Sequence, residues 1–407
     1  MTINNKNKNP NVPPLRFPEF TEKWEKYKVS DLLDFYSTNS LSWEQLEYGT
    51  EEILNLHYGL IHVGLPTMVD LSKDKLPNIK YGNNPKNYEL CKEGDIAFAD
   101  ASEDTNEVAK TIEFCNLDGK DVICGLHTIH GRDNKDITGV GFKGYAFSST
   151  AFHNQIRCIA QGTKIYSIST KNFSECYIGI PSKDEQAKIA SLLGLIDERI
   201  ATQNKIIEDL KKLKSAIIEK LYSEIQGKEY SYGQLFEVVN ERNKQMEYFN
   251  ILSASQEKGM VNRDDLNLDI QFERSNINTY KIVREGDYVI HLRSFQGGFA
   301  FSNKLGVCSP AYTILRPNRL LEFGYLSYYF TSYRFIKSLI IVTYGIRDGR
   351  SINVEEWLNM KIVIPSKEHQ LHILKVLRSI EEKIENEEAY STCLSNQKQY
   401  LLHRMFI

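Results

Sequence analysis

The side chains best suited to recognition chemistry lie in short segments that combine glycine, aromatic and polar residues. Arg and Gln can pair with base edges through two hydrogen bonds, whereas Lys and Ser can hold phosphate groups. Three such segments occur in each half of the chain, and we treat them as candidate nucleic-acid contacts. In the first half the candidate residues are His57, Tyr58, Ser102, Lys164 and Tyr166. In the second half they are Ser255, Gln256, Lys258, Arg293, Ser294, Gln296, Tyr344, Arg347 and Arg350.

A second chemical possibility is a metal site formed by Cys124, His127 and His130, which follow one another at intervals of three. On a strand, this spacing places successive side chains on opposite faces of the sheet. The sequence also lacks a second cysteine pair that could complete four ligands. We therefore expect these residues to have a structural role and expect no metal site.

The patterns of several catalytic sites are missing. The sequence contains no G-x-x-x-x-G-K-[ST] loop for nucleotide phosphates. Gly139–Gly144 matches G-x-G-x-x-G, but it follows no clear strand, no clear helix follows it, and Gln161 stands where a ribose-binding acid is expected. Pro13–Pro14 lacks the flanking residues of a DNA-adenine methyltransferase motif, and no nuclease signature or nucleophilic triad is marked. We expect no catalytic residue and no cofactor bound by this chain.

Composition indicates a globular protein that stays out of the membrane. The chain has 407 residues, of which 41% are hydrophobic and 25% are charged. No apolar run approaches the ~20 residues of a membrane span, and the N-terminus shows no apolar signal segment. The seven cysteines form no C-x-x-C pair, which indicates reduced thiols and a cytoplasmic location.

Charge is unevenly distributed along the chain. The formal net charge is −3, which by itself argues mildly against nucleic-acid binding. Between Lys281 and Arg350, however, ten Lys and Arg face only four Asp and Glu. Because the field at a cleft depends on where charges cluster, this stretch predicts a basic patch in the second half of the chain.

An internal repeat organises the sequence. Ile180–Lys183 recurs as Ile364–Lys367, at an offset of 184 residues. The same offset relates Gln186 to Gln370, and it continues without a gap for about forty residues. A period this long indicates two duplicated domains rather than a solenoid.

Each copy of the repeat leads into a long amphipathic segment. Apolar residues recur there at alternating steps of four and three, the pattern of a coiled-coil seam. The first seam is Ile189, Leu193, Ile196, Ile200, Gln203, Ile207, Leu210, Lys214, Ile217 and Leu221. The second is Ile373, Leu377, Ile380, Ile384, Glu387, Ser391, Leu394, Lys398, Leu401 and Met405. Two core helices of an ordinary globular protein would show a similar pattern, but five heptads in each favour two long helices that pack together.

Local signals refine these elements. Ser182 and Glu185 form a capping-box pattern at the start of the first helix, whereas Ser366 opens the second with a weaker cap. The expected strands include Asp95–Ala99, Ile156–Ile159, Tyr288–Leu292 and Lys361–Ile364. We therefore predict a mixed α/β (α+β) chain with five parts: 1–20, 21–181, 182–226, 227–365 and 366–407.

The order of these features resembles the specificity subunit of type I restriction–modification systems. The resemblance covers residues 13–407 and depends most on Pro14–Phe20 with Trp24, and on the two Ile-Pro-Ser segments before Gln186 and Gln370. The segments around His57 and Gln256 are similar to the first-strand segments of such domains.

The resemblance implies an arm (1–20), two target recognition domains (21–181 and 227–365) and two conserved helices (182–226 and 366–407). The helices would pair antiparallel and set the spacing between two half-sites of double-stranded DNA. The subunit itself would have no catalytic activity. Two modification subunits would bind S-adenosylmethionine and methylate adenine, and restriction subunits would use ATP and Mg²⁺.

Two alternatives remain at this stage. The chain could be a coiled-coil adaptor without a nucleic-acid role, or a self-contained DNA-modifying enzyme whose site has no recognisable motif.

Overall fold

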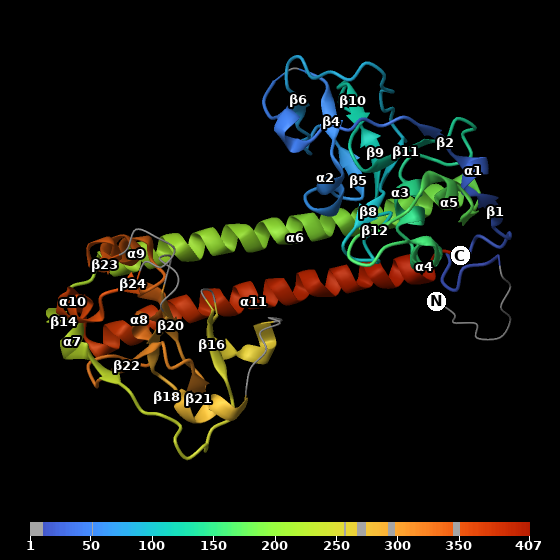
Figure 1. The fold of residues 1–407 in the computed structure, drawn as a ribbon. Helices are drawn as coiled ribbons and strands as arrows, with labels where there is room; N and C mark the ends of the chain where they lie inside the picture. Colours follow the sequence, from blue (N-terminus) through green and yellow to red (C-terminus); the bar gives the residue numbers. More distant parts are fainter. Residues whose placement is uncertain (1–10, 51, 256–257, 267–273, 292–297, 345–350) are drawn as a thin grey trace. The chain divides into compact units, whose positions relative to one another are not determined.

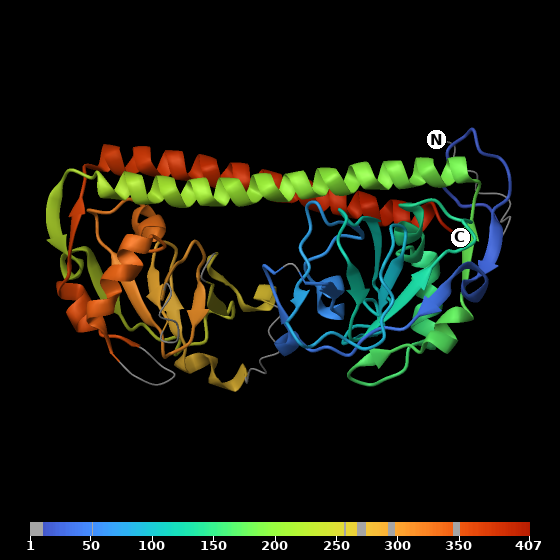
Figure 2. The same ribbon diagram turned by 90° about the horizontal axis from the view of Figure 1, so that it is seen from above.

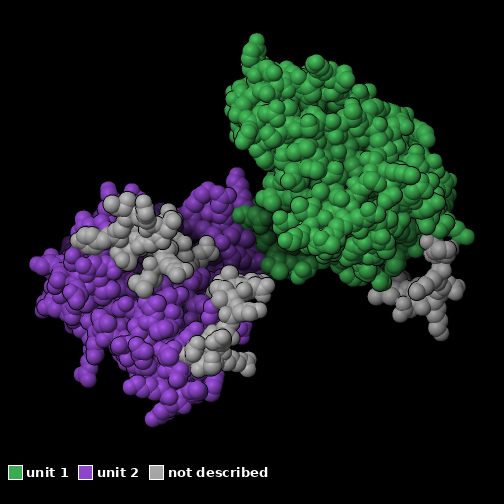
Figure 3. All heavy atoms as spheres, viewed as in Figure 1, with its two compact units in different colours: residues 1–204, 390–407 green, residues 205–389 purple. Residues whose placement is uncertain are grey.

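The computed structural model describes residues 11–50, 52–255, 258–266, 274–291, 298–344 and 351–407. It contains short strands, short helices and two long helices (Figure 1). The chain divides into two compact units, which Figure 3 shows in different colours. Unit 1 comprises Met1–Asn204 with Tyr390–Ile407, and unit 2 comprises Lys205–Ala389. Among the described residues, no helix has both the length and the apolar character needed to cross a membrane.

The strands of unit 1 form two larger sheets and two ribbons. Their bounds are β1 (Glu25–Lys28), β2 (Asp34–Tyr36), β3 (Leu46–Glu47), β4 (Leu54–Leu56), β5 (Met68–Asp70), β6 (Asn78–Ile79), β7 (Ile96–Ala99), β8 (Ala101–Ser102), β9 (Thr111–Asn116), β10 (Val122–Cys124), β11 (Thr128–Arg132), β12 (Tyr166–Ser167) and β13 (Tyr177–Ile180). The larger sheets have the orders β2-β11-β7-β9-β5 and β10-β4-β6-β3, and the ribbons are β1–β13 and β8–β12. Only β5–β9 and β10–β4 of these described pairs are parallel.

Short helices cover the sheets of unit 1. They are α1 (Val29–Leu32), η1 (Trp43–Gln45), α2 (Tyr58–His62), α3 (Phe142–Phe147), α4 (Thr150–Ile159) and α5 (Thr170–Ser174). The side chains of Phe98, Phe147 and Phe173 are buried together between β7, α3 and α5, with ring centroids 4.5 to 6.3 Å apart. Burial of these three large rings contributes to the hydrophobic stabilisation of this core.

Unit 2 has a simpler sheet and several ribbons. Its strands are β14 (Lys228–Ser231), β15 (Phe236–Val239), β16 (Leu252–Ser255), β17 (Gly259–Asn262), β18 (Lys281–Val283), β19 (Tyr288–Ile290), β20 (Phe299–Phe301), β21 (Gly306–Cys308), β22 (Thr313–Pro317), β23 (Thr343–Tyr344), β24 (Ser351–Ile352) and β25 (Lys361–Ile364). The described sheet has the antiparallel order β15-β22-β19-β20. The short helices are α7 (Tyr232–Leu235), η2 (Arg263–Leu266), η3 (Arg274–Thr279), α8 (Tyr325–Tyr329), α9 (Tyr333–Ser338), η4 (Leu339–Val342) and α10 (Val354–Asn359).

The long helices α6 (Lys183–Ser223) and α11 (Lys367–Arg404) lie side by side within each unit (Figures 1 and 2). In unit 1, Lys398 of α11 forms an ion pair with Asp197 of α6. In unit 2, Lys214 of α6 pairs with Glu381 of α11. Because later residues of α6 meet earlier residues of α11, the helices run antiparallel, as predicted.

The predicted seam residues form the less exposed side of both helices. All twenty are buried or half-buried. The polar members of the seams also find partners: besides the ion pairs of Lys214 and Lys398, Ser391 donates its hydroxyl to Asn204 at 2.8 Å. Three of the five interruptions in the apolar pattern, at Lys214, Ser391 and Lys398, therefore become specific polar contacts between the helices.

The start of α6 differs from the predicted capping box. The Glu185 carboxylate is buried and receives two N–H groups of Arg16, at 2.7 and 2.6 Å. The neighbouring Leu15 donates its backbone N–H to the carbonyl of Arg404 at the end of α11. The segment around Arg16 therefore connects to both long helices within unit 1. The predicted cap on α11 is present, since Ser366 accepts the backbone N–H of His369 at 3.3 Å.

Three of the four expected strands are confirmed, as β7, β19 and β25, within one or two residues. The prediction of a strand at Ile156–Ile159 is wrong, because these residues end α4. Ser149 caps that helix through the N–H of Phe152, and its buried residues Phe152 and Ile156 are one helical turn apart. The five domain boundaries themselves stay a prediction.

Candidate nucleic-acid interface

In unit 1 the three predicted recognition segments meet. Strands β8 and β12 pair antiparallel, which places Ser102 directly opposite Tyr166. Helix α2 begins with Tyr58, directly after His57. A ring nitrogen of His62 at the end of α2 forms a 2.9 Å hydrogen bond with a backbone carbonyl of β8. The structure therefore brings these sequence-predicted residues into one region.

His57 supports this region from the inside. Its side chain is buried, and its Nδ1 caps α2 by accepting the backbone N–H of Gly59 at 3.1 Å. Burial lowers the pKa of His57, and the nearby His127 lowers it further, so the ring is neutral at pH 7. The ring lies between those of Trp43 and Tyr58, with centroid distances of 4.5 and 4.7 Å. His57 therefore positions aromatic neighbours and is not itself exposed to a ligand.

Those neighbours form an accessible group, the aromatic patch, which we define as Trp43, Tyr58 and His127. The Tyr58 and His127 rings meet edge to face at 5.2 Å. Asp100 orients His127 through a 3.1 Å contact with its Nδ1. The side chain of Trp43 is 46% exposed. Sequence reasoning missed Trp43 and assigned His127 to a structural role, because exposure cannot be read from residue types alone.

Lys164 lies at the tip of a tight loop. The backbone groups of Gln161 and Ser167 form two hydrogen bonds that close the loop, at 3.0 and 2.8 Å. Gly162 has a positive φ, and a Cβ there would collide with the carbonyl of Ile165. Lys164 is exposed, so its ammonium group is accessible to a phosphate.

In unit 2, Ser255 and Lys258 lie on the β16–β17 hairpin. Ser255 ends β16, and its hydroxyl accepts the backbone N–H of Lys258 in the turn, at 3.3 Å. Gly259 has a φ of 69°, and a Cβ at this position would collide with the Phe301 carbonyl. The hairpin therefore packs closely on β20, and Lys258 is exposed at its turn.

Several predicted contacts of unit 2 lie outside the described residues. These are Gln256, Arg293, Ser294, Gln296, Arg347 and Arg350. Of Tyr344 the structure describes the backbone, which pairs with Ser351 in the β23–β24 ribbon. The segment 292–297 is bounded by His291 and Gly298, whose backbone groups form a 2.9 Å hydrogen bond.

Part of the predicted basic excess serves the fold. Arg316 donates from Nε and Nη2 to both oxygens of the Asp287 carboxylate, each at 2.9 Å. This contact raises the pKa of Arg316. Lys281 donates to the backbone carbonyl of Tyr312. These two cations are therefore engaged inside unit 2. The count of Lys and Arg between Lys281 and Arg350 overestimated how many positive charges are available to a ligand.

The Gly139–Gly144 segment binds a carboxylate of the protein itself. The backbone N–H groups of Gly141 and Gly144 donate to the two Glu113 oxygens at 2.9 and 2.7 Å. Lys143 lies 3.1 Å from the same buried carboxylate. Contrary to expectation, a helix (α3) does begin within this segment. Its N–H groups are engaged internally, which argues against a phosphate-binding role.

The Cys124, His127 and His130 pattern separates into two environments. The His127 side chain is exposed in the aromatic patch, whereas Cys124 and His130 are buried. Cys91, which sequence reasoning did not connect with them, brings its sulfur to 3.6 Å from that of Cys124. Its distance of 33 residues from Cys124 gave no local spacing signal.

Comparison with known proteins adds to this geometry. Residues 74–212 match the family model of the type I restriction modification DNA specificity domain. The chain is 23% identical over 406 residues to the MjaX type I restriction enzyme specificity subunit of Methanocaldococcus jannaschii, covering 93% of this chain and 91% of that protein. It is 27% identical over 258 residues to the MjaVIII specificity subunit of the same organism, covering 55% of this chain and 60% of that protein.

The fold is also similar to solved structures. One is the S subunit of a type I restriction–modification system from M. genitalium, with 16% identity, a TM-score of 0.51 and coverage of 97% of this chain and 99% of that chain. Another comes from a study of complex assembly and conformational transition in the type I restriction–modification system, with 15% identity, a TM-score of 0.62 and coverage of 96% and 98%. The predicted fold class and the predicted resemblance are confirmed.

Proposed function

We propose that this chain, which matches the family model of the type I restriction modification DNA specificity domain over residues 74–212 and is similar to type I specificity subunits, is the DNA-recognition subunit of a type I restriction–modification complex. Each unit reads one half of a bipartite, asymmetric DNA site. The chain is a recognition subunit rather than an enzyme. The adaptor and the self-contained enzyme gain no support from the comparisons.

The main support for the proposal is a set of equivalent contacts, here called the frame, that occurs once in each unit. The recognition segments that it holds differ between the two units. In unit 1, Arg132 donates from Nε and Nη2 to the two oxygens of Asp95, each at 2.8 Å. In unit 2, Arg316 makes the same two-point contact with Asp287. Each carboxylate also accepts a backbone N–H from three residues upstream.

The frame repeats where the bodies join the helices. The Gln186 side chain of α6 donates to the carbonyl of Pro181, and Gln370 of α11 donates to the carbonyl of Pro365, at 2.9 and 3.1 Å. Similarly, Tyr145 donates to Asp197 in unit 1, and Tyr328 donates to Glu381 in unit 2. Two equal frames with unlike loops suit a protein that reads two unlike half-sites.

The helices offer repeated surfaces for partner subunits. Ile206 of α6 and Tyr390 of α11 occupy equivalent positions of the repeat, and they are 41% and 40% exposed. Equivalent apolar positions suit docking of two copies of one partner. In the proposed complex, two modification subunits use S-adenosylmethionine, and restriction subunits use ATP and Mg²⁺. This chain binds none of these cofactors and works in the cytoplasm.

The test is to map N6-methyladenine across the genome of a host that has the partner subunits, with and without this gene. We expect a methylated bipartite motif that is present only with the gene. Methyl transfer by the purified chain alone would establish the self-contained enzyme instead. A methylation pattern that does not change when the gene is removed would favour the adaptor.

A further inference from the structure

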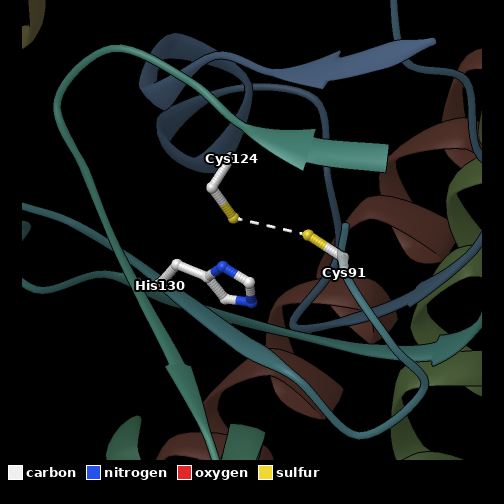
Figure 4. A group of neighbouring side chains, drawn as sticks. All are labelled: Cys91, Cys124 and His130. Carbon is white, nitrogen blue, oxygen red and sulfur yellow. Dashed lines mark hydrogen bonds between the residues drawn. The ribbon is translucent and has the colours of Figure 1, made fainter. Parts of the chain in front are cut away.

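A compact group of potential metal ligands lies in unit 1, apart from the aromatic patch. Cys91 lies beside β10, Cys124 ends β10, and His130 is in the middle of β11. Both sulfurs and one imidazole nitrogen lie within 4.8 Å of one another (Figure 4). All three residues are buried. The group therefore joins two sheets of the unit through side chains that bind soft and borderline metal ions.

The orientation of His130 leaves one nitrogen available. Its Nε2 lies 2.7 Å from Oδ2 of Asp95, and the Asp95 carboxylate also accepts a hydrogen bond from the Arg132 guanidinium. Because a carboxylate at this distance accepts a hydrogen bond, Nε2 carries the proton and Nδ1 has the free lone pair. The Nδ1 atom is buried and has no hydrogen-bond partner among the described residues. Figure 4 shows the imidazole facing the two sulfurs.

A buried nitrogen without a hydrogen-bond partner is unfavourable, so its presence needs an explanation. The arrangement Asp95–His130 is the one that orients a histidine ligand: a carboxylate accepts one ring N–H while the other nitrogen binds the ion. A metal ion between Nδ1 and the sulfurs would remove the unsatisfied group.

The sulfur separation fits tetrahedral coordination. Two thiolates bound to Zn²⁺ at about 2.3 Å, at a tetrahedral angle, have sulfurs ~3.8 Å apart. The observed distance between the sulfurs of Cys91 and Cys124 is 3.6 Å. A disulfide requires about 2.05 Å, whereas the observed distance is that of a hydrogen bond between two thiols and is also close to the separation of two ligands of one metal ion.

The repeat shows that the fold itself does not require these ligands. The bridge between Leu90 and Ile123 in unit 1 corresponds to the pairing of Ile282 with Val307 in unit 2. The position of Cys91 is therefore occupied by Val283 in unit 2.

The other two positions follow from the same frame. Cys124 corresponds to Cys308, and His130, two residues before Arg132, corresponds to Ile314, two residues before Arg316. In unit 2, Val283, Cys308 and Ile314 are buried together in an apolar core. Unit 1 therefore has a second thiol and an imidazole at the two positions where unit 2 has Val283 and Ile314.

The geometry points to a Zn²⁺ site formed by Cys91, Cys124 and His130. Two thiolates balance the charge of the ion, and the charge of Asp95 is balanced by Arg132, so the buried site is neutral overall. Binding releases the two thiol protons to solvent. A small ligand such as water completes the four-coordinate shell, as in other three-residue zinc sites.

The site would stiffen the loop that carries part of the aromatic patch. His127 lies between the ligands Cys124 and His130, and the loop is tied to α2 because Tyr58 donates its backbone N–H to Leu126. This role in positioning rests on the proposed function, whereas metal binding does not depend on it.

The experiment measures metal content in the full chain, purified under reducing conditions from zinc-supplemented cells. We expect one equivalent of Zn²⁺ by elemental analysis. After exchange with Co²⁺, we expect thiolate-to-cobalt charge-transfer absorption. Cys91→Val and His130→Ile introduce the residues of unit 2 and should weaken Co²⁺ binding by about 10-fold or more. Cys308→Val changes a buried thiol of unit 2, and Cys158→Ser changes an exposed one; both should keep the full metal content.

Folding of each variant is checked by circular dichroism, and the wild-type cobalt spectrum provides a test that needs no variant. Reduced wild-type protein with no zinc and no cobalt–thiolate bands would overturn the site. Loss of zinc with an unchanged methylation motif would remove only the positioning role.

Discussion

The Arg16 guanidinium and the Glu185 carboxylate form a two-point contact between residues 169 positions apart in the sequence, and both side chains are largely buried. The contact joins the N-terminal segment to the first turn of α6. Because a buried carboxylate without its partner is unfavourable, this pair is a sensitive point in the stability of unit 1.

Replacing Arg16 with Ala is therefore expected to lower the free energy of unfolding by about 3 kcal/mol. Urea unfolding followed by tryptophan fluorescence measures this, since Trp24 and Trp43 lie in unit 1. Lys188→Ala is the control, because its pair with Glu19 is exposed and should change stability by no more than ~0.5 kcal/mol. Equal effects of the two variants would contradict the importance of the buried pair.

The buried ring of His57 predicts a pH dependence. Burial lowers the pKa of His57 in the folded chain, so the unfolded chain binds the proton more readily. Its contribution to stability is therefore present above the unfolded pKa of about 6.5 and is lost as the pH falls through the acidic range below that value. The measurement is the urea midpoint of unit 1 across this range.

His57→Asn isolates that contribution. Asn can still cap α2 but does not titrate, so the variant should lose less stability on acidification than the wild type. His372→Asn changes an exposed residue of α11 and should leave the wild-type pH dependence intact. If His57→Asn follows the wild-type curve at every pH, the ring is not the group responsible.

The aromatic patch predicts a defect confined to one half of the DNA site. Tyr58→Ala should weaken binding of the assembled complex to its target by about 10-fold, as expected for an aromatic residue at the centre of an interface. In methylation mapping, sequence preference should relax only in the half-site read by unit 1. Tyr81→Ala is the matched control, since this tyrosine of unit 1 is 91% exposed and lies outside the patch.

If the DNA sequence preference is relaxed in both half-sites, Tyr58 acts through the whole complex rather than through recognition of one half-site by unit 1. An unchanged preference with unchanged affinity would remove the aromatic patch from the interface.

The antiparallel seam predicts how the spacer can be changed. One heptad inserted after Asn204 in α6 and one after Ala389 in α11 keep both seams in register and add about 10.5 Å to each helix. In the proposed complex the gap between half-sites should grow by about three base pairs, with both half-sites unchanged. Methylation mapping measures the gap.

A single heptad in α6 is the control. It lengthens only one helix, so the pairing of Lys398 with Asp197 on one side of the insertion and of Lys214 with Glu381 on the other cannot both be kept. The chain should therefore lose methylation or stability rather than gain a longer spacer. A doubled insertion that leaves the gap unchanged would show that the helices do not set it.

The large features of the fold could be predicted from the sequence because they repeat. The seams predicted both long helices, and the repeat offset related Gln186 to Gln370, whose side chains make equivalent contacts. Periodicity is a strong signal when it extends over many turns. A short segment such as Ile156–Ile159 carries no such signal, and there the surrounding core decides between strand and helix.

Contacts between distant residues were beyond sequence reasoning. The partner of Glu185 was taken to be its neighbour Ser182, because a capping pattern is local, whereas Arg16 lies far away in the chain. For the same reason Cys91 was not connected with Cys124. The candidate interface was predicted as a set of segments, but which ring is buried, as in His57, and which is exposed, as in Trp43, depends on packing.

The hydrogen bond between the backbone groups of Leu15 and Arg404 makes neighbours of two residues from opposite ends of the chain. Gly179, close by, has no room for a side chain because Ile407 packs against it. The order in which the two repeats are translated is therefore not what defines the architecture. A gene permuted to start at the second repeat could encode the same set of contacts, so recombination could exchange or reorder readers while the frame is retained.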